Sequence, residues 1–191
     1  SLHDALPISR YSVSIIKMPR YLDTVIVKTY PGDDMKFIFP RYFQIENENG
    51  EVLVRASSTW AVVDKNTHHV SLNPFNGVVL PCEHLDNEEM LPKKVTPKTK
   101  HHFEDRKVRY CDTDLNSHLN NTKYIEFIVD MKSREFYKEN RISHITINYE
   151  KEIVAGDTVS LFSNDDNPEY INGRVGDVNI FDAEIIYKAK D

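Results

Sequence analysis

Residues 112–137 read DTDLNSHLNNTKYIEFIVDMKSREFY, and this stretch predicts the fold class of the chain. Its second half places apolar side chains at the i, i+3, i+4 and i+7 spacing of one helix face: Tyr124, Phe127, Ile128 and Met131. Further apolar residues widen that face. We therefore expect one long helix over residues 121–137, capped by Asn120 or Asn121 and wrapped by a sheet.

Strand patterns flank this helix in the sequence. A short strand is predicted at 106–111, and further strands at 143–151, 157–163, 169–175 and 178–189. The last run alternates cleanly, with its apolar side chains on one face and charged side chains on the other. One helix packed against a curved antiparallel sheet is an α+β layer architecture.

Residues 11–73 predict a second sheet. Val, Ile, Tyr, Phe and Thr are frequent in the runs 11–17, 24–30, 36–46 and 51–64. The Asn-Gly pair at 49–50 predicts a hairpin between the last two runs. Residues 74–103 carry four prolines and many charges, as a linker does, and residues 1–10 fit no periodic pattern. We assign 1–10 no role, expect them to be foreign or disordered, and place the second domain at 104–191.

Composition excludes several classes of protein. The 191 residues suffice for one large domain or two small ones. A formal charge of -6 argues against a general nucleic-acid binder, and no apolar run approaches the ~20 residues that cross a bilayer, so we expect no membrane insertion. The two cysteines form neither a disulfide framework nor a CxxC metal site. A reducing compartment, the cytoplasm, is therefore expected.

The densest polar cluster lies just before the expected helix. In an extended backbone Asp114, Asn116 and His118 share one side, while Leu115 and Leu119 face the core. The first turn of the helix would offer free N–H groups to an oxyanion. Asp and Asn before a helix are also ordinary capping and turn residues, so the pattern alone leaves a structural role open.

A family resemblance narrows that choice. Residues 108–127, VRYCDTDLNSHLNNTKYIEF, resemble the signature of the acyl-acyl carrier protein (acyl-ACP) thioesterases, tandem hotdog enzymes of fatty acid synthesis, through the core D-x-N-x-H-x-N-N-x-x-Y. Residues 10–31 and 51–64 are similar to segments of the family's first domain. Residues 147–153, INYEKEI, resemble the family strand that ends in a catalytic acid, which here is Glu152.

The resemblance implies a catalytic network of Asp114, Asn116, His118 and Glu152. Glu152 with His118 would orient and deprotonate a water molecule, and Asn116 would position that water or polarise the thioester carbonyl. Asp114 would hold Asn116 and His118 in place. Amides at the start of the helix would stabilise the oxyanion. Neither a cofactor nor a metal ion is implied.

Strand alternation places a condition on Glu152. Ile145, Ile147 and Tyr149 share one face of their strand, and Glu152 falls on the opposite face. If the apolar face meets the helix, Glu152 points away from it. The site would then lie between domains or chains, or a bulge at residues 150–152 must redirect the carboxylate.

The amino-terminal half departs from the family pattern. Family members begin with a strand and a long helix ahead of the segment that starts here near Arg10. We therefore expect an N-terminally truncated enzyme of bacterial type, whose first hotdog, residues 11–73, is incomplete and leaves an apolar face uncovered. Such a face favours aggregation or pairing with another chain, so a homodimer is one expected arrangement.

The expected function is hydrolysis of fatty acyl-ACP to free fatty acid and ACP. Residues 93–109 hold seven basic residues against two acidic ones, a stripe that would attract the acidic carrier protein. An acyl-coenzyme A (acyl-CoA) thioesterase of hotdog type is an alternative. A non-catalytic acyl-binding or assembly module is another, which the missing helix would allow.

Other candidate residues favour structural roles. The adjacent histidines at 68–69 and 101–102 have no acid or cysteine at metal-ligand spacing and are expected on the surface. Cys111 is expected to fill space in a strand, and Trp60 to line the core or an acyl pocket.

Overall fold

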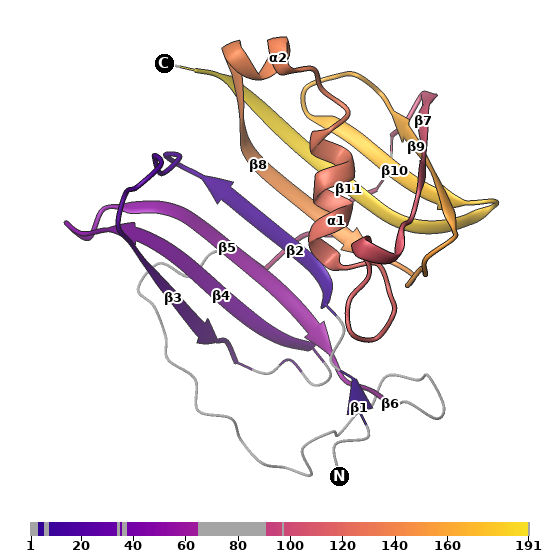
Figure 1. The fold of residues 1–191 in the computed structure, drawn as a ribbon. Helices are drawn as coiled ribbons and strands as arrows, with labels where there is room; N and C mark the ends of the chain where they lie inside the picture. The colour runs from indigo at the N-terminus through magenta and orange to yellow at the C-terminus, as the bar shows by residue number, and fades with distance from the viewer. Residues whose placement is uncertain are drawn as a thin grey trace. The chain divides into compact units, whose positions relative to one another are not determined.

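The structure is a computed structural model that describes residues 4–5, 8–33, 35, 38–64, 91–96 and 98–190. The chain divides into two compact units, Ser1–Lys94 and Val95–Asp191. Each unit carries its own antiparallel strands (Figure 1).

The first unit consists of strands in its described residues. Four of them pair antiparallel in the spatial order β3 (Val25–Pro31), β4 (Ile38–Asn47), β5 (Val52–Ala61) and β2 (Ile8–Ile15). A short pair joins β1 (Asp4–Ala5) to β6 (Val63–Asp64). β2, β3, β4 and β5 match the runs that the sequence predicted, with ends displaced by a few residues, whereas β1 lies in residues 1–10, where no strand was predicted.

The β4–β5 hairpin turns where the Asn-Gly pair predicted it. Gly50 has φ +79°, a left-handed conformation that glycine adopts without strain. The Asn47 carboxamide oxygen accepts the amides of Asn49 at 3.0 Å and Glu51 at 2.9 Å, which closes the turn. At the other end of the unit, β2 begins at Ile8. The ordered sheet therefore reaches into residues 1–10, to which the sequence assigned no role.

The second unit is a sheet with one helix across it. Its antiparallel strands follow the order β8 (Asn140–Tyr149), β11 (Val178–Ala189), β10 (Glu169–Val175), β9 (Thr158–Ser163) and β7 (His101–Lys107). Helix α1 (Asn121–Val129) lies against one face of this sheet (Figure 1). Ile128 and Phe181 are fully buried, and the Tyr124 ring meets the Phe181 ring edge to face at 5.5 Å. The α+β architecture predicted for this half is confirmed.

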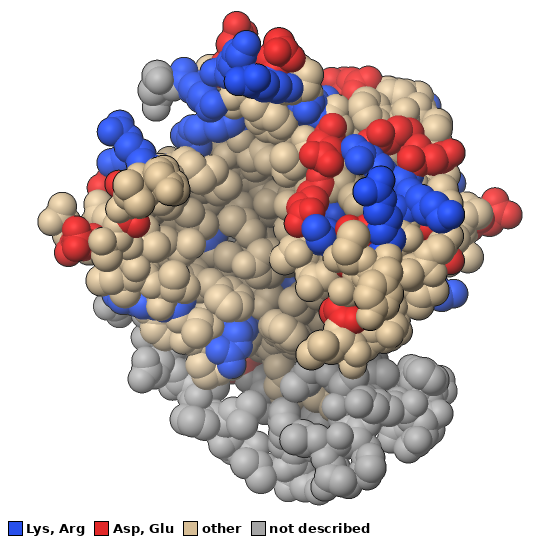
Figure 2. Space-filling model, in the orientation of Figure 1, with Lys and Arg blue, Asp and Glu red and all other residues tan. Residues whose placement is uncertain are grey.

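The outer face of α1 is polar. Lys123 and Glu126 form an ion pair at 2.6 Å, and Asp130 lies 3.5 Å from the Arg106 guanidinium. Figure 2 shows basic and acidic side chains lying next to one another on this face of the second unit. An amphipathic helix of this kind buries one stripe against the sheet and leaves the other in water.

The strand that opens the second unit differs from its prediction. β7 covers His101–Lys107 instead of 106–111, and a short 3₁₀ helix, η1 (Tyr110–Asp112), follows it. Three residues of the predicted linker therefore belong to a strand. The linker residue Val95 is also held, because its amide and carbonyl bond the Asn148 carboxamide at 3.3 and 2.9 Å. Residues 65–90 lie outside the described part of the chain.

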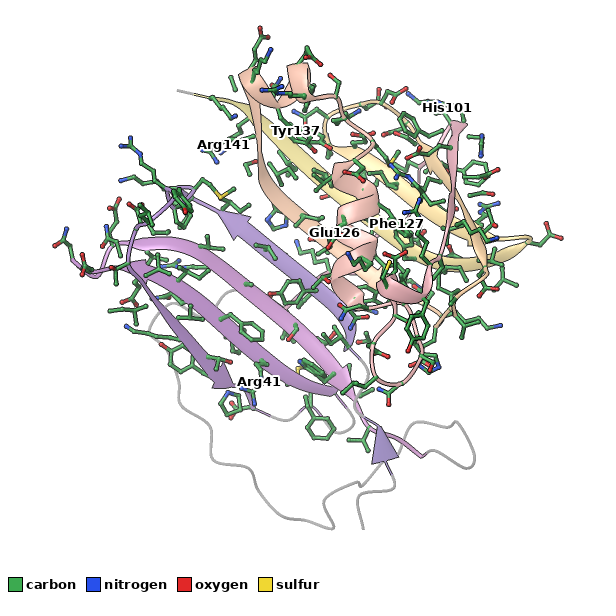
Figure 3. The ribbon with its side chains drawn as sticks, viewed as in Figure 1. Arg41, His101, Glu126, Phe127, Tyr137 and Arg141 are labelled. Carbon is green, nitrogen blue, oxygen red and sulfur yellow. The ribbon has the colours of Figure 1, made fainter. Side chains whose placement is uncertain are left out.

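The predicted long helix is two helices. α1 ends at Val129 and α2 covers Arg134–Glu139, with the Ser133 hydroxyl accepting the Phe136 amide as the cap of the second helix. Tyr137, labelled in Figure 3, donates a hydrogen bond from its hydroxyl to the Val129 carbonyl at 3.0 Å and ties the two helices together. None of the described helices is long and apolar enough to cross a membrane.

A buried ion pair lies in the turn between α1 and α2. Lys132 lies in the connecting turn, and its ammonium group is 3.0 Å from the carboxylate of Glu169, a residue with 1% of its surface exposed. The Ser163 hydroxyl also donates to that carboxylate, at 2.6 Å. The apolar periodicity could not show this ion pair, because the partner lies in β10.

Replacing Lys132 should therefore destabilise the chain strongly. We expect Lys132→Met to lower the free energy of unfolding by about 3–5 kcal/mol, because the Glu169 carboxylate is then buried without its cation. Lys138→Met is the matched control: that side chain is exposed and pairs only loosely with Glu135, so its effect should stay within about 0.5 kcal/mol. Urea denaturation measures both. Equal effects of the two substitutions would contradict this account.

Candidate functional site

The loop between β7 and α1 is closed at its ends by Asp112. The Asp112 carboxylate accepts the Arg109 amide at 2.9 Å, and the Asp112 carbonyl accepts the Asn120 amide at 2.9 Å. Thr113 and Leu119, the next residues inward, form an antiparallel β-bridge. Residues 114–118 thus form the tip of a loop whose two ends are joined at a fixed spacing.

Asp114 organises that tip. Its Oδ1 atom accepts the amides of Asn116 at 2.8 Å and His118 at 3.2 Å. Its amide donates to the His118 carbonyl at 2.8 Å, and Ser117 adopts φ +64°. Hydrogen bonds from backbone amides to a carboxylate are stronger than neutral ones, so Asp114 holds the turn that carries Asn116 and His118.

The tip is a turn and not an extended segment, which overturns the prediction for Leu115 and leaves that for Leu119 in place. Leu119 is buried, as predicted, with 3% of its surface exposed. Leu115 was predicted to face the core and is instead as exposed as in an extended chain, at 104%. Period-two alternation fails here because the Asp114 carboxylate and the left-handed Ser117 fold the backbone back on itself.

His118 and Glu152 meet although they lie far apart in the sequence. His118 Nδ1 is 3.3 Å from Glu152 Oε2, and the two side chains are 36% and 63% exposed. The Leu119 amide donates to the Ile153 carbonyl at 2.8 Å, and His118 bridges Val154 through the backbone. Backbone pairing between the two loops therefore sets the side-chain contact.

A local irregularity after β8 explains the direction of Glu152. β8 ends at Tyr149, and the amides of Glu150 and Lys151 both donate to the Ile180 carbonyl, at 2.9 and 3.2 Å. Two successive amides on one carbonyl break the alternation in the manner of a bulge. The sequence left two arrangements open for Glu152: a site between domains or chains, or a bulge that redirects the backbone at residues 150–152. The structure has the redirected backbone.

Two tyrosines beneath the site were predicted only as core residues. Tyr149 donates its hydroxyl to the Asn121 carbonyl at 3.1 Å and so ties the end of β8 to the start of α1. Tyr124 is 3% exposed, and burial together with the negative charge of Glu152 raises the pKa of its hydroxyl far above the usual range. Tyr124 thus remains a neutral group near the Glu152 carboxylate. Apolar periodicity marked both positions without revealing these polar roles.

Within the described residues, the start of α1 offers one free donor. The Asn120 carboxamide oxygen accepts the Thr122 amide at 3.0 Å and caps the helix. The Asn120 amide is already bonded to Asp112, whereas the Asn121 amide has no hydrogen-bond acceptor within the part of the chain that the structure describes. An anion at this helix end would therefore be received by Asn121 and not by Asn120.

Asn116 stands apart from the rest of the predicted network. Its side chain is exposed and has no hydrogen-bond partner among the described residues. The structure thus joins Asp114 to the backbone of Asn116 and His118, and joins His118 to Glu152. It shows no contact of the Asn116 carboxamide with either His118 or Glu152.

The remaining candidates take structural positions. His101 pairs with Asp165 at 3.1 Å and His102 with Asp105 at 2.9 Å, each on the surface as predicted, while His68 and His69 lie outside the described residues. No group of three His, Cys, Asp or Glu residues suited to a metal ion occurs within the described ranges.

The structure contradicts the position predicted for Cys111, and it places Trp60 at a half-buried position. Cys111 was predicted to fill space in a strand, but it is exposed on η1, because β7 ends before it and Val108 takes the buried position at 1% exposure. Trp60 is half-buried in β5, and its indole N–H donates to the Ser58 hydroxyl at 2.7 Å.

Comparison with known proteins covers most of the chain. Residues 7–73 match the model of the acyl-ACP thioesterase N-terminal domain, and residues 95–183 match that of the acyl-ACP thioesterase C-terminal domain. Among curated proteins, oleoyl-acyl carrier protein thioesterase 2, chloroplastic, of Arabidopsis thaliana is 23% identical over 192 residues, which cover 93% of this chain and 52% of that protein. The chain spans about half the length, or less, of the curated relatives that it matches.

Solved structures show the same fold. An acyl-ACP thioesterase from Bacteroides thetaiotaomicron superimposes with a TM-score of 0.79 at 22% identity, covering 97% of this chain and 77% of that one. A 12:0-ACP thioesterase from Umbellularia californica does so with a TM-score of 0.80 at 20% identity, covering 98% and 76%. The predicted α+β, hotdog-like fold is thereby confirmed.

The role of Asp114 in holding the turn can be tested by amide exchange. Asp114→Ala should accelerate hydrogen exchange at the amides of Asn116 and His118, because both lose their acceptor. Asp114→Asn should keep exchange near the unsubstituted rate, because its carboxamide oxygen can accept the same two bonds. NMR exchange measurements resolve the two amides. If Asp114→Ala left both rates unchanged, the turn would be held by other contacts.

Proposed function

The chain belongs to the acyl-ACP thioesterase family, and we propose that it hydrolyses the thioester of fatty acyl-ACP to free fatty acid and ACP, in fatty acid synthesis. The observation that carries this proposal is the contact between His118 and Glu152 at the base of a carboxylate-held turn. No cofactor enters the proposal.

The proposed reaction begins with a water molecule at His118. Glu152 faces Nδ1 of the imidazole, so a proton on Nδ1 is held by the carboxylate and Nε2 is free to accept a proton from water. The resulting hydroxide oxygen bonds to the thioester carbonyl carbon. The carbon–sulfur bond then breaks, the sulfur leaves with the electron pair as a thiolate, and the imidazolium proton returns to it or to water.

The other members of the proposed network support this step. Asp114 acts through the backbone and positions His118. Asn116 is free to turn its carboxamide towards the water or the carbonyl oxygen once substrate is bound. The Asn121 amide, at the positive end of α1, is the proposed donor to the oxyanion of the tetrahedral intermediate. All four predicted residues, Asp114, Asn116, His118 and Glu152, thus keep a role in the proposal.

The finer organisation is also proposed. We take each unit as one hotdog-like module of a tandem pair, with residues 11–73 as the incomplete first module and 104–191 as the catalytic one. The described residues of the first unit supply a sheet without a helix, which supports pairing with another chain, for example as a homodimer. The acidic carrier protein is the proposed macromolecular partner, and the cytoplasm the proposed location.

Thiol release from acyl-ACP measures the proposed activity directly. We expect turnover by the unsubstituted chain, and a fall in kcat of about 100-fold or more for His118→Ala and for Glu152→Gln, since each removes one half of the general-base pair. Glu150→Gln is the matched control: it is the same change, two positions away, on an exposed side chain, and should retain activity.

Three outcomes separate the proposal from its competitors. Equal turnover of acyl-CoA at matched acyl length would favour the acyl-CoA thioesterase. Acyl binding without thiol release would favour the non-catalytic module. Full activity in Glu152→Gln would remove Glu152 from the catalytic network while leaving the reaction class in place.

A further inference from the structure

The loops that carry His118 and Glu152 also present apolar side chains to water. Leu115 is 104% exposed, Tyr110 is 86% exposed and Val154 is 45% exposed. Within the first loop, the Thr113 hydroxyl donates to the Tyr110 carbonyl. The backbone bridge between His118 and Val154 joins this loop to the second one. Exposed apolar residues occur singly on most proteins, but three on the two loops of one site suggest a contact surface.

Basic residues of the same region lack ion-pair partners. Lys107 and Arg109 precede η1, and Lys151 precedes Glu152; all three are exposed, and none lies within 4.0 Å of an acidic group among the described residues. Backbone bonds from Val108 to Asp157 and from Gly156 to Val108 hold the first two beside the loop that carries Val154. By contrast, Lys100, Arg106 and Lys123 have acidic partners at 2.7, 2.8 and 2.6 Å.

The acids of this region are largely occupied. The Asp114 carboxylate accepts two amides, the Asp157 carboxylate accepts the Val154 amide at 3.0 Å, and Glu152 faces His118. Glu150 remains exposed. Among the described residues of these loops, the cations therefore outnumber the unengaged carboxylates, in a chain whose overall charge is -6.

Lys98, another basic residue of this stripe, lies elsewhere on the sheet. Val95 is bonded to the Asn148 carboxamide, and Asn148 alternates with Ile147, whose side chain is buried at 1% exposure in the helix-facing core. Lys98 lies over the Tyr170 ring at 5.0 Å. Tyr170 lies beside the Ser163 end of β9, whereas Lys107 pairs with Thr158 at the other end, so Lys98 is separated from Lys107 along the sheet.

We propose that Lys107, Arg109 and Lys151, together with Leu115 and Tyr110, form the docking surface for the acidic carrier protein that presents the acyl thioester. The inference rests on the proposed function and assigns the partner to one edge of the site. A net negative chain repels an acidic partner over most of its surface, and a local cluster of cations at the site steers that partner to the one productive orientation. The exposed leucine and tyrosine supply apolar contacts that salt does not screen.

The test compares one acyl group on two carriers. For Lys107→Glu/Arg109→Glu, we expect kcat/KM on acyl-ACP to fall about tenfold relative to kcat/KM on the same acyl group carried by N-acetylcysteamine. Leu115→Ser should lower the same ratio. Raising the salt concentration should erase the difference made by the charge substitutions and leave that of Leu115→Ser, because screening acts on charges alone.

Lys98→Glu is the control variant. It makes the same change of charge at the opposite end of β9 from Lys107 and should not move the ratio. An equal loss on both carriers for the Arg109 and Leu115 variants would overturn the docking surface while leaving the thioesterase activity standing, as would a Lys98→Glu effect of the same size. A change of molar mass in light scattering for Leu115→Ser would instead assign the surface to a second copy of the chain.

The proposed function can fail separately. If the unsubstituted chain turned over neither substrate, binding of acyl-ACP by isothermal titration calorimetry would still report on docking. If acyl-ACP bound and Lys107→Glu/Arg109→Glu weakened that binding, the proposed docking surface would be supported. If acyl-ACP did not bind, the proposed docking surface would be overturned.

Discussion

The hydrogen bond from the Leu119 amide to the Ile153 carbonyl, 2.8 Å long, joins the two loops on which the rest of the site depends. Leu119 and Ile153 are 3% and 4% exposed, so the junction is anchored by apolar burial and not by the bond alone, which is worth about 1 kcal/mol. His118 and Glu152 each come directly before one of these anchors. On either side the junction is braced, by the Asn120 cap of α1 and by the two amides that meet the Ile180 carbonyl after β8.

The carboxylates of the site divide the work according to what they touch. Asp112 and Asp114 accept backbone amides and fix the loop, whereas Glu152 faces an imidazole and stays partly in water. Contact geometry therefore distinguishes Asp114, which holds the turn, from Glu152, which lies against the histidine.

Much of the second unit could be predicted from sequence, because its signals are local. β10 and β11 have the predicted bounds, and the Asn-Gly hairpin in the first unit forms where it was expected. The residues that were misplaced depend on partners distant in the chain or on side-chain to backbone bonds. Lys132 lies in the turn after α1 and pairs with Glu169, and Leu115 is turned outwards by the Asp114 carboxylate. The apolar periodicity of the sequence carries no signal for either of these contacts.

The central claim is that Glu152 holds the His118 ring with Nδ1 towards the carboxylate and Nε2 towards the reacting water. The ¹⁵N chemical shifts of the His118 ring, recorded at a pH where the imidazole is neutral, report directly which nitrogen carries the proton. The account predicts the Nδ1–H form, and its loss in Glu152→Gln. A dominant Nε2–H form in the unsubstituted chain would contradict it.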